Sequence, residues 1–326
     1  MACRWASWKG HLANGFPMCI NHLARRFIAL ALVVLPAMAS AATWEHEYGT
    51  LTLDEPPRRI ITLNWAATEA LLLLGVTPVG MADKEGYSVW VSEPALPDGV
   101  HDIGTRVAPS LEAIAELKPD LIVTSSEMAP ASDLLEKIAP TYVISVYREG
   151  SRPAEKSREM LLTLGAMLDR ETRARDIIAD IEQTLEVQRQ RLEEAGLTDR
   201  PVALVNFLDD RHVRIYAPNG LYQTVLNGLG LSNAWPRQGN FWGFSVVGLE
   251  AIAAYEDSRL VVISPLLPGL AENLAASPFW TYLPPVRNER IYQVETTWPF
   301  GGLFQIKRLA VQLTDSLIAG GAGNVR

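Results

Sequence analysis

The sequence predicts an α/β protein of two Rossmann-like lobes, joined by a single long α-helix and enclosing a ligand cleft between them. The main observation is an internal repeat. The segment LEAIAELKPDLIVTS (residues 111–125) recurs as LEAIAAYEDSRLVVIS (residues 249–264), with one residue inserted. Each copy is typical of a short amphipathic helix, a breaker and a continuous apolar run. Such a run suits a parallel strand that is covered on both faces.

The segments upstream of the two copies are also alike. TEALLLLGVTPVG and YQTVLNGLGLSNA each predict an apolar helix that ends near a glycine, Gly75 in one and Gly230 in the other. The same order of elements therefore occurs twice. Because the period is about half the chain, the pattern favours two related lobes over a solenoid.

A charged amphipathic stretch separates the two copies, from about Pro153 to Gly196. Residues 170–195 within it predict one helix of about 35 Å, at 1.5 Å per residue. The strand-like segment RPVALVNF follows directly. We therefore expect an N-terminal lobe over 42–165, a linker helix over 166–196 and a C-terminal lobe over 197–326, with little hinge motion. The apolar positions of the stretch from Pro153 to Gly196 recur at helical spacing: Leu161, Leu162, Leu164, Ile177, Ile178, Ile181, Leu185 and Leu192.

The first 41 residues have the layout of a secretory signal peptide. The pair Arg25-Arg26 precedes the short apolar run FIALALVVLPAMASAA, which ends in small residues and predicts cleavage after about Ala41. Met1 or Met18 could be the start, and the export route, Sec or twin-arginine, stays open. Removing 1–41 takes four of the 29 basic and none of the 37 acidic residues, so the net charge falls from −8 to −12. That charge argues against nucleic acid or an anionic membrane as partner.

Signatures of catalysis are missing from the sequence. It has no nucleophile elbow, P-loop or dinucleotide-binding glycine motif, and both cysteines fall within residues 1–41. The histidines beyond residue 41, His46, His101 and His212, lack metal-ligand spacing. We therefore expect no catalytic residues, no metal site and no cofactor.

Aromatic residues gather in three loops, GYSVWVSEP, QGNFWGFS and ETTWPFGG. Such loops run over the surface, so three of them favour a shared aromatic cleft, although each could instead cap its own lobe. Arg106 lies between a Gly-Thr turn and a Pro-Ser helix start, with no carboxylate obviously placed to pair with it. It either awaits an anionic ligand or pairs with an acidic neighbour such as Asp102 or Glu127.

Four segments carry a resemblance to a known family: YSVWVSEPALPDGVHDIGTRVAPSLEAIAELKPDLIV, RHVRIYAPNGLYQTVLNGLGLSNAW, NFWG and TTWPFGG. Together they resemble the periplasmic ferric-hydroxamate (ferrichrome-type) siderophore-binding proteins of ABC importers, over about residues 59–320. The resemblance implies a periplasmic, monomeric binding protein that is not an enzyme and that delivers a ferric siderophore to an inner-membrane ABC permease. Iron would be held by six siderophore oxygens, so the protein would supply no metal ligand.

The resemblance also implies a set of ligand-binding residues. Arg106 matches the family's arginine to the hydroxamate oxygens, and Phe300 matches a pocket tyrosine. Trp90, Trp242 and Trp298 match its pocket indoles.

Two positions depart from the family. Met128 stands at a tyrosine that reaches the hydroxamate, and Ser125, Ser126 or Glu127 could substitute for it. Arg214 stands at an apolar pocket position. It either favours a more anionic ligand, such as a hydroxamate–citrate siderophore, or points to solvent.

Asp133 and Glu250 match the residues that dock the family to its permease. Glu112 takes the place of Glu250 in the first repeat and is a rival candidate. Each of these acidic residues could instead simply stabilise a helix N-terminus. Two other functions stay open: binding of another large chelate, cobalamin or haem, and a periplasmic enzyme that acts on a siderophore.

Overall fold

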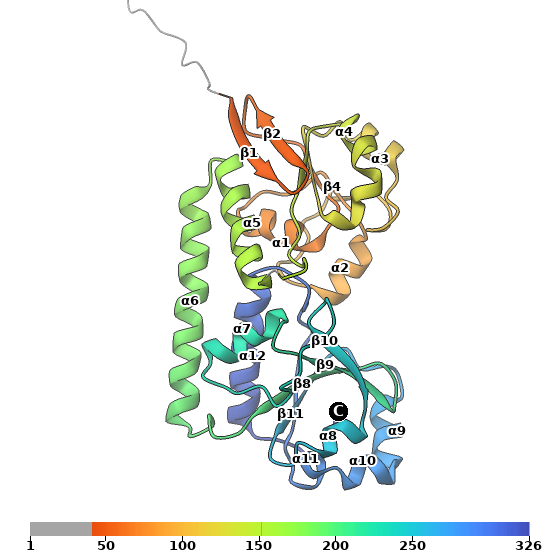
Figure 1. Cartoon of the computed structure of the whole chain (residues 1–326), viewed down its shortest axis with the longest axis vertical. Helices are drawn as coiled ribbons and strands as arrows, with labels where there is room; N and C mark the ends of the chain where they lie inside the picture. Colours follow the sequence, from red (N-terminus) through yellow and green to blue (C-terminus); the bar gives the residue numbers. More distant parts are fainter. Residues whose placement is uncertain (1–40, 151, 326) are drawn as a thin grey trace, which may run out of the picture. The chain divides into compact units, whose positions relative to one another are not determined.

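The computed structural model describes residues 41–150 and 152–325 (Figure 1). The expected signal peptide, apart from Ala41, lies outside the described residues. The described residues after Ala39 form one compact unit. Within the described ranges no helix is both long and apolar enough to cross a membrane.

The N-terminal lobe is built on a five-stranded parallel sheet with the order β5-β4-β3-β6-β7. An antiparallel hairpin, β1 (Ala42–His46) with β2 (Gly49–Leu53), precedes it. The strands are β3 (Ile60–Thr62), β4 (Gly80–Met81), β5 (His101–Asp102), β6 (Leu121–Thr124) and β7 (Thr141–Val143). The helices are α1 (Trp65–Leu73), α2 (Lys84–Trp90), α3 (Leu111–Glu116), the 3-10 helix η1 (Ser126–Ala131), α4 (Ser132–Glu136) and α5 (Pro153–Met167).

The C-terminal lobe has a mixed five-stranded sheet with the order β10-β9-β8-β11-β12. β8, β11 and β12 are parallel, whereas β8, β9 and β10 form an antiparallel meander that the repeat did not predict. The strands are β8 (Val202–Phe207), β9 (His212–Tyr216), β10 (Phe244–Gly248), β11 (Arg259–Ile263) and β12 (Ile291–Val294). The helices are α7 (Leu221–Gly228), α8 (Glu250–Ala253), α9 (Leu270–Ala276), α10 (Pro278–Tyr282), α11 (Pro284–Arg287) and α12 (Phe304–Ala319).

The repeated segments fold as predicted, and β6 and β11 explain why their sequences are apolar throughout. Both strands are buried at every residue. In β6, Leu121 and Val123 join the core that contains α1 and α5, while Ile122 faces the core of α3 and α4. Alternate residues of a strand point to opposite faces, so a strand covered on both sides needs apolar residues at every position.

The long helix between the lobes is α6 (Glu171–Glu194), which at 1.5 Å per residue is about 36 Å long. It begins later than the expected 166–196, because α5 ends at Met167 and residues 168–170 separate the two helices. α6 packs against α5 on the N-terminal side and against α7 and α12 on the C-terminal side (Figure 1). One hydrophobic core accordingly runs through both lobes, from Leu51 and Leu121 to Val261 and Leu317.

Candidate ligand-binding site

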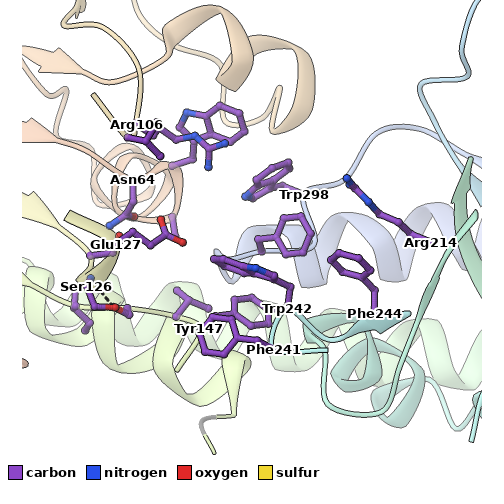
Figure 2. Close-up of a pocket in the computed structure, with 18 residues that line it drawn as sticks. Asn64, Arg106, Ser126, Glu127, Tyr147, Arg214, Phe241, Trp242, Phe244 and Trp298 are labelled. Carbon is purple, nitrogen blue, oxygen red and sulfur yellow. Dashed lines mark hydrogen bonds between the residues drawn. The ribbon is translucent and has the colours of Figure 1, made fainter. Parts of the chain in front are cut away.

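A cavity of about 590 Å³ lies between the two lobes. Each lobe contributes a wall of different character (Figure 2). The N-terminal lobe supplies a polar wall made of Asn64, Arg106, Ser125, Ser126, Glu127 and Ser145. The C-terminal lobe supplies an aromatic wall made of Phe241, Trp242, Phe244, Trp298 and Phe300, together with Arg214.

The topology of the sheets explains why these residues meet. Asn64 follows β3, Ser125 follows β6, and Arg106 lies four residues beyond the end of β5. Trp298 follows β12 of the other lobe in the same way. The carboxyl ends of parallel strands share one edge of a sheet, which is where open α/β sheets place their ligand crevices.

Arg106 is held by aromatic rings more than by charge. Its Cζ lies 3.9 Å from the centroid of Trp65 and 5.5 Å from that of Trp298. Its acidic neighbour is Asp83, with Nε 3.5 Å from Oδ2, and neither Asp102 nor Glu127 is paired with it. The Asp102 carboxylate instead accepts hydrogen bonds from the backbone N–H groups of Lys84 and Gly104.

Two buried nitrogen donors on the polar wall lack a hydrogen-bond partner. They are Arg106 Nε and Asn64 Nδ2. Asn64 Oδ1 is used, because it accepts from Ala67 N at 2.8 Å and so caps α1. A buried donor without a partner costs free energy, so the pair points to an oxygen-rich ligand at this wall.

Two serines of the polar wall, Ser126 and Ser145, are tied to the β1–β2 hairpin. Ser145 Oγ lies 2.9 Å from Glu47 Oε2 and 2.8 Å from Ser126 Oγ. Since a carboxylate only accepts, the Ser145 hydroxyl donates to Glu47. The hairpin thereby fixes these two serines on the polar wall of the cavity.

Phe300 is the centre of the aromatic wall. Its ring centroid lies 4.9 Å from that of Trp298, 5.6 Å from that of Trp242 and 5.9 Å from that of Phe244. All three distances fall in the range of favourable aromatic pairs. The wall is therefore one connected surface.

Tyr147 supports this wall from the N-terminal side. Its hydroxyl donates to Pro299 O at 2.7 Å and accepts from Leu221 N at 3.1 Å. Burial raises the pKa of Tyr147 above its usual value, so the phenol stays protonated and remains a donor.

A buried polar network holds the Trp298 loop from behind. Glu69 on α1 accepts from Phe304 N at 2.9 Å and from Gln305 Nε2 at 2.7 Å. Gln305 Oε1 in turn accepts from Trp298 N at 3.1 Å. Burial raises the pKa of Glu69 to about 8, although these hydrogen bonds oppose the rise. The network links α1 of one lobe to α12 of the other.

The structure brings together five of the residues expected at the site: Arg106, Trp242, Trp298, Phe300 and Arg214 all line the cavity. Trp90, also expected at the site, does not line the cavity. It lies at the end of α2 and is 40% exposed, and its ring centroid is 6.4 Å from that of Trp298.

Met128 does not line the cavity. It is 6% exposed and packs in the core with Ile61, Ile114 and Leu135. The turn of η1 directs its side chain inward, whereas the preceding residues Ser125, Ser126 and Glu127 line the cavity.

Asn64, Tyr147 and Ser145 line the cavity but were missed from the sequence. Asn64 carried a usable signal, because it directly follows the apolar run IITL and begins a helix. Tyr147 and Ser145 follow a short strand with no distinctive motif.

The expected docking residues are placed as helix-terminal acidic residues. Asp133 lies in the first turn of α4 and Glu250 in the first turn of α8, and both are exposed. Glu112 lies in the first turn of α3, where its carboxylate accepts from Ser110 Oγ at 3.2 Å. Their role in docking stays a prediction.

In the described part of the chain, no three His, Cys, Asp or Glu side chains form a group that could hold a metal ion.

Two α/β lobes, a connecting helix and a cavity between the lobes are the architecture of a solute-binding protein. Comparison with known proteins identifies the family. The family model for periplasmic binding proteins matches residues 60–296, and the chain belongs to that family.

Individual relatives agree with the resemblance noted from the sequence. The chain is 31% identical to the iron(3+)-hydroxamate-binding protein FhuD of Escherichia coli K12, over 95% of this chain and 100% of that protein. It is 27% identical to the Fe(3+) dicitrate-binding periplasmic protein FecB of the same organism, over 87% and 93%. The crystal structure of Fe3+-Desferal-bound FhuD from Vibrio cholerae matches with a TM-score of 0.77 and 30% identity, over 81% and 99%.

Proposed function

We propose that this protein binds a ferric siderophore of the hydroxamate type in the interlobe cavity and delivers it to an inner-membrane ABC transporter. The observation that carries the proposal is Arg106, which is stacked on Trp65 beside an apolar aromatic wall and whose buried Nε has Asp83 as a charged neighbour but no hydrogen-bond partner. An arginine fork suits the oxygens around the iron, and the aromatic wall suits the organic body of the chelate.

The division of the cavity into two walls gives the mechanism of capture. Six oxygens of the siderophore saturate Fe(III), a hard cation, so the protein binds the complex rather than the metal. The oxygen-rich side of the chelate faces Arg106, Asn64 and the serines, while its carbon backbone packs on Trp298 and Phe300. The predicted signal peptide and the names of the relatives support export to the periplasm, where such a carrier would meet its ligand.

Delivery involves the exposed acidic residues Asp133 and Glu250, one on each lobe. We propose that they meet basic positions of the permease and orient the loaded protein. Charges at the rim of such an interface act mainly on the rate of encounter.

Tryptophan fluorescence tests the proposed ligand, because three indoles line the cavity. The purified protein is titrated with ferrichrome, a ferric hydroxamate–citrate siderophore, cobalamin and haemin. We expect saturable quenching by a ferric hydroxamate, weakened by at least about tenfold in Arg106→Ala, which corresponds to 1.4 kcal/mol.

Arg58→Ala is the matched control, because Arg58 is an exposed arginine of the same lobe outside the cavity. Binding of cobalamin or haemin alone would contradict the proposal, as would equal affinities of the two variants. Conversion of the bound siderophore, followed by mass spectrometry, would instead indicate an enzyme.

A further inference from the structure

Arg214 is a second arginine on the cavity wall, and it comes from the opposite lobe to Arg106. It lies in the middle of β9 and is partly exposed. Figure 2 shows its side chain reaching toward the aromatic wall, on the side of the cavity away from Asn64 and Glu127. The two cations therefore mark two separate positions for negative charge.

The sheet leaves Arg214 without an acidic neighbour. Its cross-strand partners are Asn206 on β8 and Val246 on β10, neither of which carries charge. Its Cζ lies 5.2 Å from the centroid of Phe244, a cation–π contact. Among the described residues no carboxylate is paired with Arg214, whereas Arg106 has Asp83.

The charges on the walls decide where a ligand anion can go. Glu127 adds negative charge to the N-terminal wall, so a free carboxylate is disfavoured there. Arg214 offers a planar fork of donors that matches a carboxylate, beside aromatic rings that reduce screening by water. A cavity-lining arginine that has an aromatic neighbour but no carboxylate partner suits an anionic group of the ligand.

We infer that the natural ligand carries a free carboxylate in addition to its iron-binding groups, and that Arg214 binds that carboxylate. This inference rests on the proposed function, and it names the class of siderophore. Arg214 is then a specificity-determining residue that separates acidic from neutral ferric hydroxamates.

A matched series of ligands tests this directly. The trihydroxamate in Desferal ends in a primary amine, which can be acylated without change to the iron-binding groups. The ferric complexes of its N-acetyl, N-succinyl and N-glutaryl derivatives then differ only in a neutral end or a carboxylate on one of two arm lengths. Affinities are measured by tryptophan fluorescence for the wild type, Arg214→Gln and Arg211→Gln.

We expect the wild type to bind one of the two acidic complexes about tenfold more tightly than the acetyl complex. In Arg214→Gln the ratio of acidic to neutral affinity should fall to about one. In Arg211→Gln the ratio should persist, because Arg211 is an exposed arginine near the start of β9 that does not line the cavity.

A second measurement needs no variant. In the wild type, the ratio of acidic to neutral affinity should decrease as the NaCl concentration is raised, because salt screens a partly exposed ion pair.

Equal affinity for the neutral and both acidic complexes in the wild type would overturn the inference and leave the proposed function intact. Survival of the full ratio in Arg214→Gln would overturn it equally. If none of the ferric complexes binds, the proposed function fails and this inference fails with it.

Discussion

At the scale of single residues, the site is defined by donors without partners. Arg106 and Asn64 each have a buried nitrogen without a hydrogen-bond partner at the polar wall, although most buried polar groups in proteins are hydrogen-bonded. A ligand rich in oxygen atoms would supply acceptors for both nitrogens. Met128, by contrast, is buried among apolar side chains and does not line the cavity.

Met128→Ala separates a core residue from a ligand contact. We expect it to lower the free energy of unfolding by about 2 to 5 kcal/mol, the range for truncating a buried methionine. The affinity for a ferric hydroxamate should change by less than about threefold, or 0.7 kcal/mol. Urea unfolding and fluorescence titration check the two numbers, with Met128→Leu as the volume-conserving control. A large loss of affinity with little loss of stability would return Met128 to the site.

At the scale of elements, the aromatic wall depends on contacts made behind it. Gln305, at the start of α12, accepts from Trp298 N and donates to both Glu69 and Glu93 O. One side chain therefore joins the Trp298 loop to two segments of the other lobe. Tyr147 of the N-terminal lobe likewise donates a hydrogen bond to Pro299 O of the same loop.

Gln305→Leu removes these bonds while nearly keeping the volume. We expect a loss of about 1 to 3 kcal/mol in stability, because Glu69 and Trp298 N are left with unsatisfied buried groups. Affinity should also fall, since the Trp298 loop loses its anchor. Gln312→Leu on the same helix is the control, because the side-chain oxygen of Gln312 has no hydrogen-bond partner. Unchanged affinity in Gln305→Leu would show that the loop keeps its position without Gln305.

The pKa of Glu69 makes a prediction about pH. Its value of about 8 lies above the ordinary value of 4.5, so the folded protein holds this proton more tightly than the unfolded chain does. Stability from this group is therefore fully present below about pH 4.5 and is lost as the pH rises through about 8, by on the order of 5 kcal/mol at most. Arg308 beside it opposes the shift.

Unfolding free energies at pH 5, 6, 7 and 8 check this for the wild type and Glu69→Gln. The variant cannot titrate, so the difference between the two curves should change steadily across the range. Parallel curves would contradict the prediction, whatever the absolute stability of the variant.

Some elements of the fold and some residues of the site can be predicted from the sequence, and others cannot. The strands β6 and β11, the helices α1 and α7 and the long helix were readable, because each depends on a local periodicity or a glycine. The antiparallel β9 and β10 were not, since their pairing is decided by distant partners. At the site, Arg106 and the aromatic loops stood out by composition. Tyr147 and Ser145 did not, because their importance comes from hydrogen bonds to Pro299 and Glu47, which are far away in sequence.

At the scale of the whole molecule, the two lobes share one hydrophobic core. It includes Leu121 of β6, Ile178 of α6, Leu226 of α7 and Leu309 of α12. Such a core couples the lobes energetically, because neither can lose its structure without exposing apolar surface of the other.

We therefore expect the lobes to unfold in a single transition. Urea midpoints from far-ultraviolet circular dichroism and from tryptophan fluorescence should coincide, as cooperative two-state unfolding requires. The comparison is made without ligand, because a bound ligand would stabilise both lobes together. Two separated midpoints would show that each lobe is stable by itself.

A shared core also bears on how occupancy is signalled to a partner. We expect lobes coupled in this way to keep nearly the same outline whether the cavity is empty or filled. Val107 and Phe241 line the cavity and are 78% and 50% exposed, so they mark its mouth. A partner that contacts this mouth would sense the cargo by touching it. The bound ligand would then form part of the surface that the partner recognises.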